Sequence, residues 1–174
     1  MRLFIAINFS KDICGKLAAL REDLRARSQG GRFALDENLH LTLAFLGECD
    51  AKQAATAKSV MNAASFEPFA VSIVRVGRFR RDGGDIWWAG LSDDKPLMNL
   101  QRELAERLKD CGFTLEMRKY SPHITLGREV ITDSAPWKIA PFGETISSIE
   151  LMRSERINGR QIYTAIFEKR GAAE

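Results

Sequence analysis

The chain has 174 residues, of which 45% are hydrophobic and 28% are charged, and its formal net charge is +3. This length and composition are typical of one globular domain and exclude a disordered or fibrous protein. The mildly basic balance allows a polyanionic partner but is too small to indicate a dedicated nucleic-acid coat protein.

The first half of the chain predicts two strands and two helices. A strand is expected over residues 2–9, followed by a helix that begins at Ser10 and ends near Gly30 and Gly31. The apolar residues of this helix recur at helical spacing: Ile13, Leu17, Leu20 and Leu24. A second strand over residues 38–46 precedes an alanine-rich helix over residues 51–64, which ends before Pro68.

The second half predicts two hairpins separated by a helix and a strand. Residues 69–79 and 86–91 form the first hairpin, and a helix beginning near Pro96 ends at Cys111 and Gly112. A strand over 120–128 follows, then a loop region over 137–143 with prolines, and a closing hairpin over 145–153 and 160–167. The mixture of hairpins and helical crossovers predicts an α+β fold with mainly antiparallel pairing, in a single domain over residues 1–174.

The location and assembly of the protein are predicted from what the sequence lacks. The first apolar stretch, residues 3–7, is too short for a signal peptide or a membrane span. The three cysteines, Cys14, Cys49 and Cys111, are widely spaced and match neither a disulfide framework nor a zinc site. We therefore expect a cytoplasmic protein that does not bind a membrane and is a monomer.

Both histidines of the chain stand in the same tetrapeptide pattern. His40 begins the sequence HLTL and His123 begins HITL, 83 residues later. With 7 threonines and 17 leucines in the chain, a histidine meets this pattern by chance about once in 250. The repetition therefore indicates a shared role, and the order strand, helix, motif strand recurs loosely in both halves.

Strand geometry predicts which way the motif side chains point. Successive side chains alternate faces, so His40 and Thr42 point to one side while the leucines between and around them point to the core. The same alternation places His123 and Thr125 together. Two such strands side by side would present two imidazoles and two hydroxyls to one site.

This set of groups is chemically sufficient to break a phosphodiester bond without a cofactor. One imidazole must be neutral to accept a proton from water, and the other must be cationic to protonate the leaving oxygen. The ordinary histidine pKa of about 6.5 allows both forms near neutral pH. The threonine hydroxyls can donate to the nonbridging oxygens as charge develops on phosphorus.

Two other interpretations of the histidines are open. A lone histidine is usually a satisfied surface or core residue, but the repeated pattern argues against this interpretation. Metal binding would need three or four ligands, and neither motif has a neighbouring His, Cys or carboxylate on the same face. We expect no metal and no cofactor.

The motifs and their order resemble the 2H phosphoesterase superfamily, in particular its RNA 2′,3′-cyclic phosphodiesterases, historically named 2′-5′ RNA ligases. The resemblance extends over nearly the whole chain. The segments that carry it are RLFIAI at residues 2–7, LHLTLAFLG at residues 39–47, GRF at residues 77–79 leading to Trp87, and SPHITLGR at residues 121–128. Gly127 stands where many relatives have alanine, which is a change of one small residue for another.

The resemblance implies a bilobal fold in which two mainly antiparallel sheets with outer helices are related by a pseudo-twofold axis, with the motif strands lining a central cleft. It also implies that His40 is the proton donor to the leaving 3′ oxygen and His123 the proton acceptor that activates water. The substrate would be RNA ending in a 2′,3′-cyclic phosphate, and the product a 2′-phosphomonoester.

Other functions for the same motifs stay open. The same chemistry could cleave or join 2′-5′ linkages or hydrolyse small cyclic phosphates, although no P-loop for ATP-driven joining is found in the sequence. A non-catalytic RNA-binding module is a further alternative. The presence of both His and Thr pairs argues against it.

Several further residues have two possible roles. Arg128 could pair with a phosphate or be an ordinary arginine at a strand end. The basic run of Arg75, Arg78, Arg80 and Arg81 could follow an RNA backbone or be a solvated loop. Among the aromatic residues, Phe45 has the alternation of a core residue, and Trp87 and Trp88 must face opposite sides of their strand.

Overall fold

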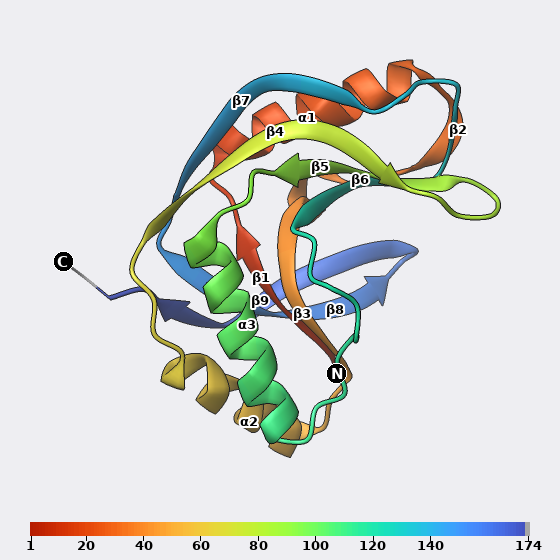
Figure 1. Cartoon of the computed structure of the whole chain (residues 1–174). Coiled ribbons are helices and arrows are strands. Elements are labelled where there is room, and N and C mark those ends of the chain that lie inside the picture. The colour runs from red at the N-terminus through yellow and green to blue at the C-terminus, as the bar shows by residue number, and fades with distance from the viewer. Residues whose placement is uncertain (173–174) are drawn as a thin grey trace.

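The computed structural model describes residues 1–172 and consists of two antiparallel sheets with helices on their outer sides (Figure 1). Its strands are β1 (Arg2–Asn8), β2 (Ser28–Phe33), β3 (His40–Glu48), β4 (Phe69–Phe79), β5 (Asp85–Leu91), β6 (His123–Thr132), β7 (Trp137–Ile146), β8 (Ser148–Ile157) and β9 (Arg160–Arg170). Its helices are α1 (Lys11–Ala26), α2 (Ala51–Ala63), α3 (Lys95–Asp110) and the short 3-10 helix η1 (Asp36–Asn38).

The two motif strands belong to different sheets and meet where the sheets come together. One sheet has the order β3-β1-β8-β9 and the other the order β2-β6-β5-β4-β7, with every pair antiparallel. Strands β3 and β6, which carry the histidines, lie side by side where the sheets meet. The predicted α+β fold with two mainly antiparallel sheets is confirmed.

The crossover helices are exchanged between the two sheets. Helix α1 follows β1 of the four-stranded sheet, yet it packs on β2, β6 and β7 of the other sheet. Helix α3 connects β5 to β6 in the five-stranded sheet, yet it packs on β3 of the other sheet and on α2 as well as on β4. Each motif strand is therefore supported partly by a helix from the opposite half of the repeat, which ties the two halves together.

Local sequence signals explain where the helices begin. The Ser10 hydroxyl accepts a hydrogen bond from the backbone N–H of Ile13, and Asp94 caps α3 in the same way. Asp50 and Gln53 form a reciprocal capping box at the start of α2. The buried faces of α1 and α3 then follow helical periodicity.

Two segments differ from the sequence prediction. The first helix ends at Ala26 rather than near Gly30, and the segment after it pairs with β6 as strand β2. At Gly31, where φ is +150°, a Cβ atom would lie 3.1 Å from Val130, so glycine permits the close approach of these strands.

The predicted loop over 137–143 is instead strand β7, which pairs only with β4. This edge position tolerates Pro141, which has no N–H to donate.

The other predicted elements are confirmed with boundary shifts of a few residues. The predicted strand over 38–46 begins at His40 after η1, and the strand expected over 120–128 runs instead from His123 to Thr132. The predicted single domain includes residues 173 and 174, which lie outside the described residues. Among residues 1–172, no helix is long and apolar enough to cross a membrane.

Candidate active site

The alternation predicted for the motif strands is present in the structure. The first two inward leucines of β3, Leu41 and Leu43, are buried in the core, as are the corresponding residues Ile124 and Leu126 of β6. The motif histidines and threonines point to the opposite side and are half-buried. We call this side of the two sheets the site face, defined by His40, Thr42, His123 and Thr125.

Both imidazoles are held by the same backbone contact. The Nδ1 atom of His40 lies 2.7 Å from the carbonyl oxygen of Asn38, and Nδ1 of His123 lies 2.7 Å from the carbonyl oxygen of Ser121. A carbonyl oxygen can only accept, so Nδ1 carries the hydrogen in each ring and Nε2 is the atom that gains or loses a proton. Nε2 of His40 lies 2.9 Å from the hydroxyl oxygen of Thr42.

The carbonyl that orients His40 belongs to a segment fixed from two sides. Asn38 ends η1, and its side-chain amide donates to the backbone carbonyl of Gln161 on β9 at 2.9 Å. The buried guanidinium of Arg21 in α1 forms an ion pair with Asp36 and donates to the backbone carbonyl of Ala34 at 2.9 Å. The sequence did not predict η1 because its three polar residues have no hydrophobic period.

An aromatic pair surrounds each histidine. The ring centroid of His40 lies 4.9 Å from that of Phe4 and 5.2 Å from that of Tyr163. The ring centroid of His123 lies 5.0 Å from that of Phe79 and 6.2 Å from that of Trp88. Packing against these rings partly removes each imidazole from water.

This burial is the main cause of the altered acidity of both histidines. Burial lowers the pKa of His40; the Asn38 carbonyl opposes this shift, whereas the charges of His123 and Arg128 add to it. Burial likewise lowers the pKa of His123, with the Ser121 carbonyl opposing and the charge of Arg128 adding to the shift. The positive charge of Arg128 thus lowers the pKa of both histidines.

A β-bulge at the same place in both motifs reverses the alternation after the fourth residue. In β3 the pairing with β1 passes over Leu43, so Leu43 and Ala44 both point inward and Phe45 turns to the site face. Phe45 is 58% exposed and lies 6.0 Å from the Phe4 ring. The prediction that Phe45 has the position of a core residue is therefore wrong, because strict alternation does not survive a bulge.

The corresponding bulge in β6 explains where Arg128 lies. The pairing with β5 passes over Leu126, so Gly127 points inward and Arg128 joins His123 on the site face. A Cβ atom on Gly127 would lie 3.0 Å from the Val130 side chain and 3.1 Å from that of Phe33, which accounts for a small residue there. Arg128 is exposed and is thus available to an anion beside the histidines.

The structure separates the residues of the basic run. Strand β4 places Arg75 on the site face, with its guanidinium 5.7 Å from the Trp88 ring. Arg78 instead covers the core residue Trp87 at 5.4 Å and lies 3.9 Å from the Asp85 carboxylate. Trp87 is fully buried in the core while Trp88 packs beside His123, so the prediction that they face opposite sides is confirmed.

Tyr120 connects the two motif strands and was not singled out from the sequence. Its hydroxyl donates to the backbone carbonyl of Thr42 at 2.8 Å, and burial raises the pKa of this phenol. Tyr120 precedes His123 by three residues, so this bond holds the start of β6 against β3. A single tyrosine before a strand has no sequence signal that would distinguish this role from core packing.

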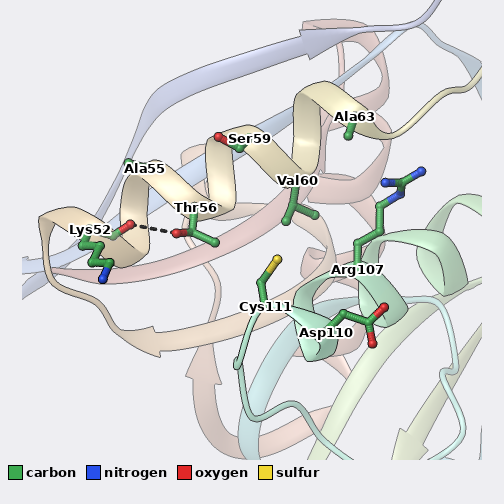
Figure 2. Close-up of a pocket in the computed structure, with 9 residues that line it drawn as sticks. All are labelled: Lys52, Ala55, Thr56, Ser59, Val60, Ala63, Arg107, Asp110 and Cys111. Atoms are coloured by element: carbon green, nitrogen blue, oxygen red, sulfur yellow. Dashed lines mark hydrogen bonds between the residues drawn. The ribbon is translucent and has the colours of Figure 1, made fainter.

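A recess lies between α2 and α3 (Figure 2). It has a volume of about 500 Å³ and is lined mainly by small residues of α2 together with Arg107, Asp110 and Cys111. Its lining includes neither histidine of the repeated motif, so the site face is the better candidate. Among residues 1–172, no group of three or more His, Cys, Asp or Glu side chains is arranged to hold a metal ion.

Comparisons with known proteins agree with this fold and these motifs. Residues 9–157 match the model of the 2′-5′ RNA ligase superfamily. The RNA 2′,3′-cyclic phosphodiesterase of Thermotoga maritima is 34% identical over 131 residues, covering 74% of this chain and 70% of that protein. The protein of the same name from Methanocaldococcus jannaschii is 30% identical over 179 residues, covering 97% and 99%.

A solved structure shows the same fold. The crystal structure of E. coli LigT complexed with 3′-AMP matches with a TM-score of 0.89 at 24% identity, over 99% of this chain and 98% of that chain. The family resemblance predicted from the two motifs is thus confirmed. The chain belongs to the 2′-5′ RNA ligase superfamily.

Proposed function

We propose that this protein hydrolyses 2′,3′-cyclic phosphate ends of RNA to 2′-phosphomonoesters, using His40 and His123 and no metal ion. The observation that carries the proposal is that both imidazoles are anchored through Nδ1 on adjacent strands, which leaves both Nε2 atoms to exchange protons. The names of the relatives from Thermotoga maritima and Methanocaldococcus jannaschii support the choice of substrate.

In this mechanism the two histidines act in one displacement. Nε2 of neutral His123 takes a proton from a water molecule while the water oxygen forms a bond to phosphorus. The bond from phosphorus to the 3′ oxygen breaks, and Nε2–H of cationic His40 gives its proton to that oxygen. The assignment of donor and acceptor follows the family resemblance. Afterwards the two imidazoles return to their starting states by exchanging protons with solvent.

Thr42, Thr125 and Arg128 are proposed to bind the phosphate. Negative charge on the nonbridging oxygens increases in the transition state, and hydroxyl and guanidinium donors aimed at them stabilise it. Arg128 can serve because the bulge turns it toward the histidines. Without substrate, Nε2 of His40 and the Thr42 hydroxyl are hydrogen-bonded to each other. With substrate bound, the cationic Nε2–H turns to the 3′ oxygen and the Thr42 hydroxyl donates to a nonbridging oxygen.

The proposal is tested with an oligoribonucleotide that ends in a 2′,3′-cyclic phosphate, followed by phosphorus NMR of the product. We expect a 2′-phosphomonoester and unchanged turnover in excess EDTA. A 3′-phosphate as the main product would reverse or remove the donor and acceptor roles. Loss of turnover with EDTA and its recovery with zinc or manganese would contradict the metal-free mechanism.

A further inference from the structure

The site face offers different chemistry on its two sheets. On the four-stranded sheet, His40 packs against the rings of Phe4 and Tyr163, and the exposed ring of Phe45 lies beside Phe4. On the five-stranded sheet, cationic side chains continue away from His123. A substrate with one reactive phosphate and further phosphates behind it would use the second surface, because each additional phosphate needs a cation.

The strand register defines a row across the five-stranded sheet. His123 on β6 pairs with Gly90 on β5, and Arg75 on β4 pairs with both Gly90 and Lys138 on β7. Directly paired residues lie on the same side of a sheet. The row therefore carries an imidazole, a glycine, a guanidinium and an ammonium in line on the site face.

The spacing of this row suits a chain of phosphates. Neighbouring strands lie about 4.8 Å apart, so the Cα atom of Arg75 is about 10 Å and that of Lys138 about 14 Å from that of His123. At Gly90 no side chain rises from the sheet, and the Trp88 ring covers this position. The Trp88 ring lies 6.2 Å from His123 and 5.7 Å from the Arg75 guanidinium, so it connects the catalytic and the cationic parts of the row.

Both cations are available to an external anion. Arg75 and Lys138 are exposed, and within residues 1–172 neither forms an ion pair with a carboxylate. Arg75 donates one long bond of 3.4 Å to the carbonyl of Leu91, which leaves most of its donors unused. Arg78, by contrast, is bound to the Asp85 carboxylate and the Ser134 carbonyl on the core side.

We propose that Arg75 and Lys138 bind the phosphates that precede the reacting cyclic phosphate, so that the upstream RNA strand leaves the site across β5, β4 and β7. This inference rests on the proposed function and adds to it a preference for oligonucleotides over mononucleotides. A mononucleotide with a 2′,3′-cyclic phosphate has no upstream phosphates, so Arg75 and Lys138 do not contribute to its binding.

The test compares two substrates in the full-length protein. Kinetics are measured with adenosine 2′,3′-cyclic phosphate and with a short oligoribonucleotide carrying the same end. In the double variant Arg75→Gln/Lys138→Gln, kcat/KM should fall at least tenfold more for the oligonucleotide than for the mononucleotide. The dependence of log kcat/KM on log salt for the oligonucleotide should also flatten by about 1.4, which corresponds to two lost contacts to a single strand.

Two variants of the β4–β5 turn serve as comparisons. Arg80→Gln removes one exposed charge outside the row and should leave the substrate preference as in the wild type. Arg81 follows the end of β4 and lies 5.8 Å from the Phe79 ring, which packs on His123, so an RNA strand leaving along β4 toward the turn would depend on it. A selective loss in Arg81→Gln with none in the double variant would overturn the proposal, as would equal losses for both substrates in the double variant.

A binding measurement separates this proposal from the proposed function. Fluorescence anisotropy with an oligoribonucleotide ending in a 2′-phosphate needs no turnover. We expect at least tenfold weaker binding by the double variant. If the wild type hydrolysed neither substrate, the proposed function would fail while this measurement still decided the role of the row. Equal binding by the wild type and the double variant would refute the proposal that Arg75 and Lys138 bind the upstream phosphates.

Discussion

Replacing Gly77 by alanine should displace Trp88 from its place beside His123. The six-membered ring of Trp88 occupies the space beside two glycines, Gly77 and Gly90, and a Cβ atom on Gly77 would lie 2.4 Å from Cη2 of this ring and 2.8 Å from two further ring carbons. Carbon atoms in contact are normally about 3.5–4.0 Å apart. The ring also packs against Phe79 at 5.3 Å and lies 6.2 Å from the His123 ring. A methyl group on Gly77 must therefore displace the indole from its present position beside these two rings.

Such overpacking in a well-packed region costs about 1–3 kcal/mol in the free energy of unfolding. With a urea dependence of about 2 kcal/mol per molar, a cost of 2 kcal/mol lowers the unfolding midpoint by about 1 M. Urea titration followed by tryptophan fluorescence measures this shift. Because Trp88 packs beside His123, its displacement should also lower kcat for cyclic phosphate hydrolysis, measured in urea-free buffer where the variant is folded.

Gly15→Ala is the matched control. Gly15 lies inside α1, is exposed, and a Cβ atom added there would meet no atom within 4 Å. The same substitution should therefore stabilise the protein by about 0.5–1 kcal/mol, because alanine favours helix more than glycine does. If the Gly77→Ala variant were as stable and as active as the wild type, the close packing of Trp88 beside Gly77 would be needed for neither stability nor activity.

Further variants and a pH profile test the proposed mechanism. His40→Ala and His123→Ala should each lower kcat/KM about 10²–10⁴-fold. The kcat/KM of the double variant should be only slightly below that of the less active single variant. If steady-state kinetics gave multiplicative losses instead, the two histidines would act in separate steps. The pH profile of kcat/KM should be bell-shaped, with both limbs shifted to the acid side by the lowered pKa values of the pair. In Arg128→Gln both limbs should move to higher pH, because the lost positive charge had favoured the neutral imidazoles; limbs that stay in place would mean that Arg128 acts only on substrate. Tyr120→Phe removes the hydrogen bond that holds the start of β6 to the Thr42 carbonyl. It should therefore lower the free energy of unfolding by about 1 kcal/mol and lower kcat severalfold. An unchanged kcat would show that Tyr120 contributes to stability but not to catalysis.

Features with strong local signals could be predicted from the sequence, whereas features that depend on strand pairing could not. The helix beginning at Ser10 has a cap and a hydrophobic period, and the paired motifs indicate their own side-chain directions. Strand β2 has neither signal, since it is polar and contains Gly30 and Gly31. It is a strand because β6 offers it a free edge, which is a property of the sheet and not of residues 28–33.

The bulges show why two nearly identical motifs can perform different tasks. Up to the fourth residue, the two strands place the same groups on the site face. The fifth residue points inward in both, and the sixth returns to the site face as Phe45 in one strand and Arg128 in the other. A duplicated strand therefore gives two imidazoles of similar geometry, while the residue after the bulge places an apolar ring on one side and a positive charge on the other. In the proposed reaction this difference matters, because an anionic phosphate binds where the guanidinium is and thereby fixes how the ester lies between two otherwise similar histidines.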